Sequence, residues 1–287
     1  MGSRGFLLRA NARWLVKVAL ITGGASGIGK AIGEELARRG VEVVLADRQL
    51  AVAESVAEGI RKEGGRASAA ELDVRSFPAW EALVKDTIER TGSIDYLFNN
   101  AGIGVGGEIS DYELRDWDDV IDVNLRGVTH GIQAVYPRMI AQRSGHIINT
   151  ASMAGLVAAP EGSYTATKHA VVGLSKALRV EAKRHGVRVS VLCPGAIRTP
   201  ILTGGKFGRI NIPNATDEKI LAQWEHLRPM DPRELARQAL DAIERDRAII
   251  VIPRWWKAFW YLERISPSLS FRVWGKVMDH LRSALET

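Results

Sequence analysis

The feature that most constrains the fold is a glycine-rich stretch at residues 22–29. It follows a short apolar run, residues 18–21, whose lack of alternation is typical of a strand buried on both faces of a parallel sheet. A helical pattern follows it to about Arg39. Strand, glycine turn and helix in this order predict a site where helix amides and the helix dipole bind a pyrophosphate. The alternative is a plain glycine turn.

Residues within the stretch have separate expected roles. Gly23 allows the tight turn, Gly27 lets the backbone approach a phosphate, and Gly29 permits close packing of the helix on the sheet. Ser26 and Ile28 lie between these glycines and are expected to contact the same ligand.

Further apolar strands alternate with helices along the chain. Strands are predicted at residues 41–46, 67–74, 94–98, 146–150, 188–192 and 248–252, and helices at 50–63, from Pro78, at 113–142 and from Tyr164 to about His185. This alternation predicts an α/β fold with a doubly wound parallel sheet of seven strands. The helical stretch 113–142 is expected to be interrupted at Asn124, whose amide can prop open a local irregularity.

Asp47 ends the second strand, about 20 residues past the glycine turn, where a carboxylate can accept both ribose hydroxyls of an adenosine. Because that carboxylate would repel a 2′-phosphate, the charge favours NAD over NADP. Arg48 follows at once and could pair with the phosphate, so NADP stays open as the alternative. Asp47 could also be a simple loop acid.

Tyr164 and Lys168 are four residues apart at the start of a predicted helix, so their side chains share one face. A nearby cation stabilises a phenolate and lowers its pKa from about 10. The pair therefore predicts an acid/base couple. Because most pairs at this spacing are solvated surface pairs, the interpretation depends on the rest of the chain.

Several motifs in this order resemble those of the classical short-chain dehydrogenase/reductases, over about residues 16–253. They are the glycine turn, Asp73, residues 99–102 (Asn-Asn-Ala-Gly), Asn124, Ser152, Tyr164 with Lys168, and Pro194-Gly195 with Thr199. The resemblance implies a Rossmann-like single domain, with residues 1–15 as an N-terminal extension and residues 254–287 as a helical C-terminal extension. It also implies hydride transfer between a nicotinamide dinucleotide and an alcohol or ketone.

The resemblance implies four catalytic residues. Tyr164 would be the general acid in carbonyl reduction and the base in alcohol oxidation. Lys168 would lower the pKa of Tyr164 and bind the nicotinamide ribose. Ser152 would hold the substrate oxygen, and Asn124 would hold a water that links Lys168 to solvent. Ser152 and Tyr164 are one residue closer than in the commonest family spacing, so Ser163 is the alternative hydroxyl.

The implied cofactor contacts extend along the whole cleft, and no metal site is predicted. Asp73 and Val74 would meet the adenine, with Asp47 and Arg48 at the adenosine ribose. The remaining implied contacts are Asn100, Ala101 and Gly102 on the adenosine side, Thr150, Tyr164 and Lys168 in the middle, and Pro194, Gly195, Ile197 and Thr199 at the nicotinamide end.

Residues 199–232 cover the substrate in the family, and here they are rich in apolar side chains. They predict a hydrophobic alcohol or ketone substrate, unless they pack on the domain or on a second subunit. The family usually forms homodimers or homotetramers, and the same is expected here. The rival function is a dinucleotide-binding regulatory or scaffold protein without catalysis.

Residues 254–287 combine aromatic and basic side chains. Such a segment can lie in a membrane interface, dock on a partner subunit, or pack on its own domain. The chain of 287 residues has a net charge of +6 without a basic tract, so no nucleic-acid partner is expected. A single cysteine, Cys193, and the lack of a secretory signal or a spanning apolar run predict a cytoplasmic protein, peripheral at the membrane if the tail binds there.

Overall fold

The computed structural model describes residues 16–159, 161–212 and 216–286, with side chains described as far as Lys276. The predicted N-terminal extension, residues 1–15, lies outside the described residues. Within the described part, no helix is long and apolar enough to cross a bilayer.

The centre of the molecule is a sheet of seven parallel strands in the order β3-β2-β1-β4-β6-β7-β9, which confirms the predicted fold class. Apolar residues with no polar alternation form its middle strands, because both faces of the sheet are covered. The third strand is shorter than predicted and the sixth is longer. The strands are β1 (Val18–Thr22), β2 (Glu42–Asp47), β3 (Ala67–Glu71), β4 (Tyr96–Asn99), β6 (His146–Thr150), β7 (Arg188–Pro194) and β9 (Ile249–Ile252).

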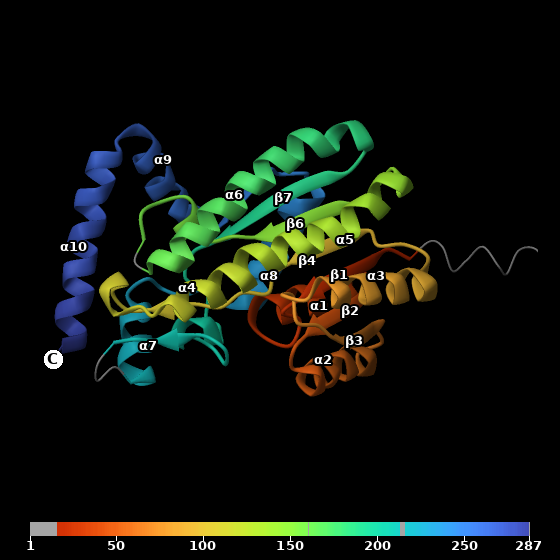
Figure 1. Cartoon of the computed structure of the whole chain (residues 1–287), viewed down its shortest axis with the longest axis horizontal. Helices are drawn as coiled ribbons and strands as arrows, with labels where there is room; N and C mark the ends of the chain where they lie inside the picture. The colour runs from red at the N-terminus through yellow and green to blue at the C-terminus, as the bar shows by residue number, and fades with distance from the viewer. Residues whose placement is uncertain (1–15, 160, 213–215, 287) are drawn as a thin grey trace, which may run out of the picture.

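Helices cover both faces of the sheet, as Figure 1 shows. One apolar core lies under α1 (Gly27–Arg38), α2 (Leu50–Lys62) and α8 (Pro232–Glu244). The other lies under α3 (Phe77–Thr91), α5 (Gly127–Gln142) and α6 (Gly162–Ala182). Because the chain starts from β1 and later returns to β4 on its other side, the carboxyl ends of these two strands flank a crevice where such sheets bind ligands.

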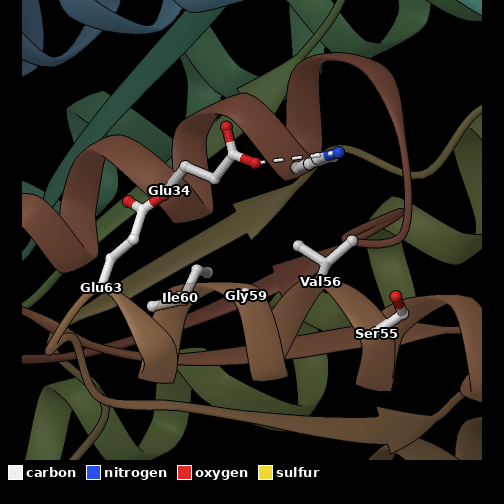
Figure 2. A pocket seen from close by; sticks show the side chains of 7 residues that line it. Glu34, Ser55, Val56, Gly59, Ile60 and Glu63 are labelled. Atoms are coloured by element: carbon white, nitrogen blue, oxygen red, sulfur yellow. Dashed lines mark ion pairs between the residues drawn. The ribbon is translucent and has the colours of Figure 1, made fainter.

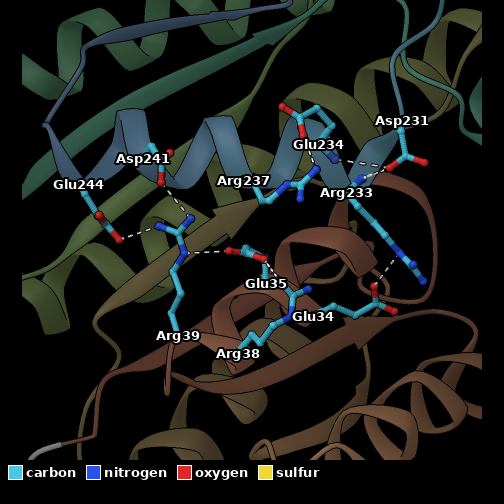
Figure 3. Close-up of polar contacts among 10 residues, drawn as sticks. All are labelled: Glu34, Glu35, Arg38, Arg39, Asp231, Arg233, Glu234, Arg237, Asp241 and Glu244. Atoms are coloured by element: carbon cyan, nitrogen blue, oxygen red, sulfur yellow. Dashed lines mark hydrogen bonds and ion pairs between the residues drawn. The ribbon is translucent and has the colours of Figure 1, made fainter.

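Ion pairs join α1 to α8 across the first of these layers (Figure 3). The Arg39 guanidinium lies 3.0 Å from a Glu35 carboxylate oxygen, 2.9 Å from Asp241 and 2.8 Å from Glu244. Asp231 caps α8 by accepting a hydrogen bond of 2.7 Å from the Arg233 amide. These contacts fix the helix that carries the glycine turn.

The predicted long helix at residues 113–142 is interrupted where Asn124 lies, as expected. It consists of α4 (Leu114–Ile121), a π-helical turn (Asp122–Arg126) and α5. The widened turn leaves the Asn124 side chain buried and free to bond outside the helix.

Two further parts of the chain lie beside the carboxyl edge of the sheet. Residues 199–232, here called the covering segment, contain a 3₁₀ turn (Pro200–Thr203), the short strand β8 (Arg209–Ile210), which pairs with β5 (Val105–Gly106), and α7 (Asp217–Glu225). The C-terminal extension forms a 3₁₀ turn (Arg254–Trp256), α9 (Lys257–Ile265) and α10 (Pro267–Glu286). α9 and α10 form a hairpin at one end of the molecule, and α10 contacts α7 (Figure 1).

Candidate active site

The glycine turn has the geometry expected of a phosphate-binding turn. Gly23 and Gly27 have φ angles of +66° and +53°, which residues other than glycine rarely adopt. A Cβ on Gly29 would lie 2.2 Å from the Gly23 carbonyl oxygen. Ser26 precedes α1 without a side-chain cap, so the first amides of the helix are open to an anion. These features fit a dinucleotide pyrophosphate.

Thr22, which the sequence analysis did not single out as a site residue, joins the turn to the next strand. Its hydroxyl oxygen accepts hydrogen bonds of 3.0 Å from both the Asn100 and the Ala101 amide. The Asn100 side chain donates to the Thr22 carbonyl at 3.1 Å and accepts from the Thr150 hydroxyl at 3.3 Å. The sequence could have indicated this role, because Thr22 is a polar residue at the end of an apolar strand, directly before the glycines.

At the adenosine end, Asp47 and Arg48 have different surroundings. The Asp47 carboxylate accepts hydrogen bonds from the Ala25 amide at 3.1 Å and the Gln49 amide at 2.9 Å, which orients it beside the turn. The Arg48 guanidinium lies 3.6 Å from the Asp73 carboxylate and 4.5 Å from the centre of the Phe207 ring. Arg48 therefore already has partners within the chain.

Asp73 and Val74 lie after β3, in a loop next to these residues. Arg75 donates to the Asp73 carboxylate at 2.7 Å, and this hydrogen bond is the main reason why the pKa of Asp73 is below its usual value. The Val74 carbonyl accepts hydrogen bonds from the Trp80 indole at 3.2 Å and the His130 ring at 3.1 Å.

Ser152, Tyr164 and Lys168 come together at the carboxyl ends of β6 and β7. The Ser152 hydroxyl is near enough to the Tyr164 phenol to lower its pKa. The Lys168 ammonium is buried, donates to the Thr150 carbonyl at 2.9 Å and lies 5.3 Å from the centre of the Tyr164 ring. Ser163, the alternative hydroxyl, is buried beside Tyr112, so Ser152 is the serine at Tyr164.

The protonation of this cluster is governed by burial. Burial lowers the pKa of Lys168 to about 8, while the adjacent Cys193 acts in the opposite direction. Burial raises the pKa of Tyr164 above its usual value, the hydrogen bond with Ser152 opposes this, and the Glu161 carboxylate adds to it. Desolvation of the phenolate is the largest influence on this pKa, and the expected lowering of it by Lys168 stays a prediction.

Asn124 is a buried positioning residue in the structure. Its side chain accepts a hydrogen bond from the Ile103 amide and donates one to the Ile103 carbonyl, both at 2.9 Å. A Cβ placed on Gly102 would lie 3.3 Å from the Asn124 side-chain oxygen and 3.5 Å from the Lys168 nitrogen. Asn124 and Lys168 thus converge on one point, and a water held between Lys168 and solvent stays a prediction.

Glu161 is a second residue that the sequence analysis did not identify. It has a φ of +70° and lies directly before α6, three residues from Tyr164. Burial raises the pKa of its carboxyl to about 7. A glutamate in a loop rich in small residues does not indicate burial in the sequence. The burial of Glu161 results from how this loop packs in the folded protein.

At the nicotinamide end, the predicted residues follow β7. Pro194 pairs with Ile252 in the sheet, and Ile197 is buried against Met230. A Cβ on Gly27 would lie 3.2 Å from the Thr199 methyl group, which places Thr199 over the glycine turn.

Gly195 is covered by Trp256, from the C-terminal extension. A Cβ on Gly195 would lie 2.2 Å from the Trp256 indole nitrogen. This contact joins residues far apart in the sequence, so the sequence analysis could not assign Trp256 to the site.

The covering segment is held against α4. The Arg209 guanidinium lies 2.7 Å from the buried Asp116 carboxylate and 2.9 Å from Asp119. The core under α3, α5 and α6, called the main core below, is also contacted by Phe207, Trp224 and Leu227. Several of the apolar residues expected to contact substrate therefore also pack on their own domain.

A separate pocket lies between α1 and α2 (Figure 2). It is lined by Lys30, Glu34, Ser55, Val56, Gly59, Ile60 and Glu63, and Lys30 pairs with Glu34 at 3.8 Å. None of the predicted catalytic residues lines it. Within the described part of the chain, no three His, Cys, Asp or Glu side chains are grouped closely enough to hold a metal ion.

A family model of the short chain dehydrogenases matches residues 17–205. The chain belongs to this family. The chain is 43% identical over 189 residues to an uncharacterized oxidoreductase of Listeria monocytogenes, an alignment that covers 65% of this chain and 76% of that protein.

Solved structures of the family show the same fold. A short chain dehydrogenase/reductase from Burkholderia phymatum in complex with NAD is 32% identical, with a TM-score of 0.79 over 90% of this chain and 96% of that chain. A metagenomic short-chain oxidoreductase in complex with NADP is 37% identical, with a TM-score of 0.60 over 63% of this chain and 83% of that chain. Related proteins therefore bind either dinucleotide.

Proposed function

We propose that the protein interconverts a hydrophobic secondary alcohol and its ketone, with NAD(H) favoured as cofactor and Tyr164 as the general acid/base. The observation that supports this most is the cluster in which the Ser152 hydroxyl meets the Tyr164 phenol beside the buried Lys168 ammonium. The joint presence of Tyr164, Lys168, Ser152 and Asn124 argues against a regulatory protein that only binds a dinucleotide.

The bound nicotinamide would supply or accept the hydride. During ketone reduction, negative charge grows on the substrate oxygen, and the hydroxyls of Ser152 and Tyr164 would stabilise it by donating hydrogen bonds. Tyr164 would then transfer its proton to that oxygen. The Lys168 ammonium, 5.3 Å from the ring centre, would stabilise the phenolate that forms.

Charge supports NAD over NADP. The Asp47 carboxylate is held at the end of β2 by two backbone amides, where it would repel a 2′-phosphate. Arg48, the cation that could bind that phosphate, is already paired with Asp73 and stacked on Phe207. Apolar residues in the covering segment support a hydrophobic substrate, and assembly as a homodimer or homotetramer stays a prediction.

Tyr164→Phe tests the proposal. It should lower kcat by about a thousandfold or more, because general acid/base catalysis is lost, while NAD binding measured by calorimetry stays within a few-fold. Tyr96→Phe, on β4, is the matched control and should leave turnover unchanged. Full activity of Tyr164→Phe on a panel of alcohols and ketones would reject the assignment, and a native protein that binds NAD but turns over nothing would favour the scaffold function.

A further inference from the structure

Some aromatic side chains of the C-terminal extension are covered by the domain. Trp256, in the turn before α9, is 4% exposed, and its ring centre lies 6.3 Å from that of Trp274 on α10 and 5.5 Å from that of Phe259 on α9. These rings pack on the main core of the domain. Packing on the chain's own domain, one of the three interpretations of this segment, therefore holds for these rings.

Large apolar side chains are also exposed near the turn between the two helices. Ile265 is 83% exposed and Phe271 is 59% exposed, with Tyr261 and Leu269 beside them in the sequence and also exposed. The turn lies at the outer edge of the molecule, away from the sheet (Figure 1). Four exposed large apolar side chains within residues 261–271 indicate an interaction surface.

The charge around this apolar surface is positive. Residues 254–276 contain five basic residues and a single acid, Glu263, one of whose carboxylate oxygens is buried. Residues 1–17 and 254–287 together hold ten of the 39 basic residues of the chain but only three of its 33 acidic residues. The net positive charge of the protein thus comes from its two terminal segments.

We propose that the α9–α10 hairpin docks the protein on an anionic membrane surface, with Ile265 and Phe271 inserted among the lipids. Exposed aromatic and aliphatic side chains flanked by Arg264 and Arg272 match what an interfacial helix requires. Basic residues near an anionic surface add electrostatic attraction. A second copy of this chain is a poorer occupant, because it would bring two positively charged surfaces together.

Vesicle co-sedimentation of the full-length protein tests the proposal. We expect binding to vesicles that contain phosphatidylglycerol, weak binding to phosphatidylcholine alone, and loss of binding at high salt because exposed charges are screened. Ile265→Asp with Phe271→Asp should weaken binding by about tenfold or more, since two apolar groups are lost and two negative charges are added.

Leu114→Asp is the matched control, because Leu114 is 84% exposed but lies on α4. It should bind vesicles as the native protein does. Thermal unfolding and size-exclusion chromatography of each variant separate docking from misfolding and from changes in assembly.

Failure of the native protein to bind anionic vesicles would overturn the proposal, as would equal binding by the hairpin variant. If that variant instead separated an oligomer while the native protein ignored vesicles, the surface would be a subunit contact. Vesicle binding needs no turnover, so these outcomes do not depend on the proposed reaction.

Discussion

Polar groups at the glycine-turn end of the cleft are paired with one another, whereas buried ionisable groups at the Tyr164 end have few partners. In the first region, Thr22, Asn100 and Thr150 satisfy each other through hydrogen bonds of 3.0 to 3.3 Å. In the second, Lys168 has burial as the main influence on its pKa and a backbone carbonyl as a hydrogen-bond partner, with no ion pair to a carboxylate among the described residues.

This difference separates binding from chemistry. A site that binds a pyrophosphate needs backbone amides held in fixed positions by close packing. Such a site lowers the stability of the fold very little. A site that moves protons needs groups whose pKa values burial has shifted, and such groups destabilise the folded state. A side chain added at the glycine turn should therefore weaken dinucleotide binding. Removal of a buried charge at the Tyr164 end should instead stabilise the folded protein.

Gly29→Ala should have the largest effect. The new Cβ would lie 2.2 Å from the Gly23 carbonyl oxygen and 2.6 Å from the Asn100 side-chain nitrogen, so the turn must shift. We expect NAD affinity, measured by calorimetry, to fall by about a thousandfold, equal to about 4 kcal/mol. Stability in urea should fall by about 1–3 kcal/mol, the usual cost of overpacking.

Gly59→Ala is the control for this substitution. A Cβ on Gly59, in α2, meets nothing within 4 Å, so alanine should leave NAD binding unchanged and stabilise the helix by up to about 1 kcal/mol. Normal NAD binding by Gly29→Ala would show that the turn is not the phosphate site.

Lys168→Met should abolish most activity and yet stabilise the protein at neutral pH. The pKa of Lys168 falls from 10.5 to about 8 in the folded state, so at pH 7 the fold must hold a charge that burial disfavours. This shift corresponds to about 3 kcal/mol at most, since one pKa unit equals about 1.4 kcal/mol.

The pH dependence of native stability shows whether the charge on Lys168 stabilises or destabilises the fold. Between pH 8 and 10.5 the unfolded chain holds more protons on Lys168 than the folded protein does, so native stability rises with pH through this window. Lys168→Met lacks the group, and its advantage in urea unfolding should shrink over the same range. Lys176→Met, an exposed residue of the same helix, should show no such trend. A destabilised Lys168→Met at pH 7 would contradict the comparison.

The two regions also differ in how far the sequence predicts them. The glycine turn is local, because residues 22–29 contain the strand end, the turn and the helix start. The positions of Tyr164 and Lys168 on one helix face follow from their spacing alone. Burial of Glu161 and the packing of Trp256 on Gly195 depend on loops and helices distant in the sequence. The sequence patterns therefore predicted that Tyr164 and Lys168 share one helix face, but not the burial that sets their pKa values.

Asp47→Asn should have the smallest effect. It tests whether the carboxylate at the adenosine end of the cleft selects NAD over NADP. The substitution removes the charge that would repel a 2′-phosphate and keeps an oxygen that can accept the hydrogen bond from Ala25. The ratio of kcat/KM for NAD over NADP should fall by about tenfold, equal to about 1.4 kcal/mol. Arg48→Ala is the companion variant, and it should change the ratio by less because Arg48 is already paired with Asp73. A ratio that responds to Arg48 and not to Asp47 would mean that the cation, and not the carboxylate, selects the cofactor.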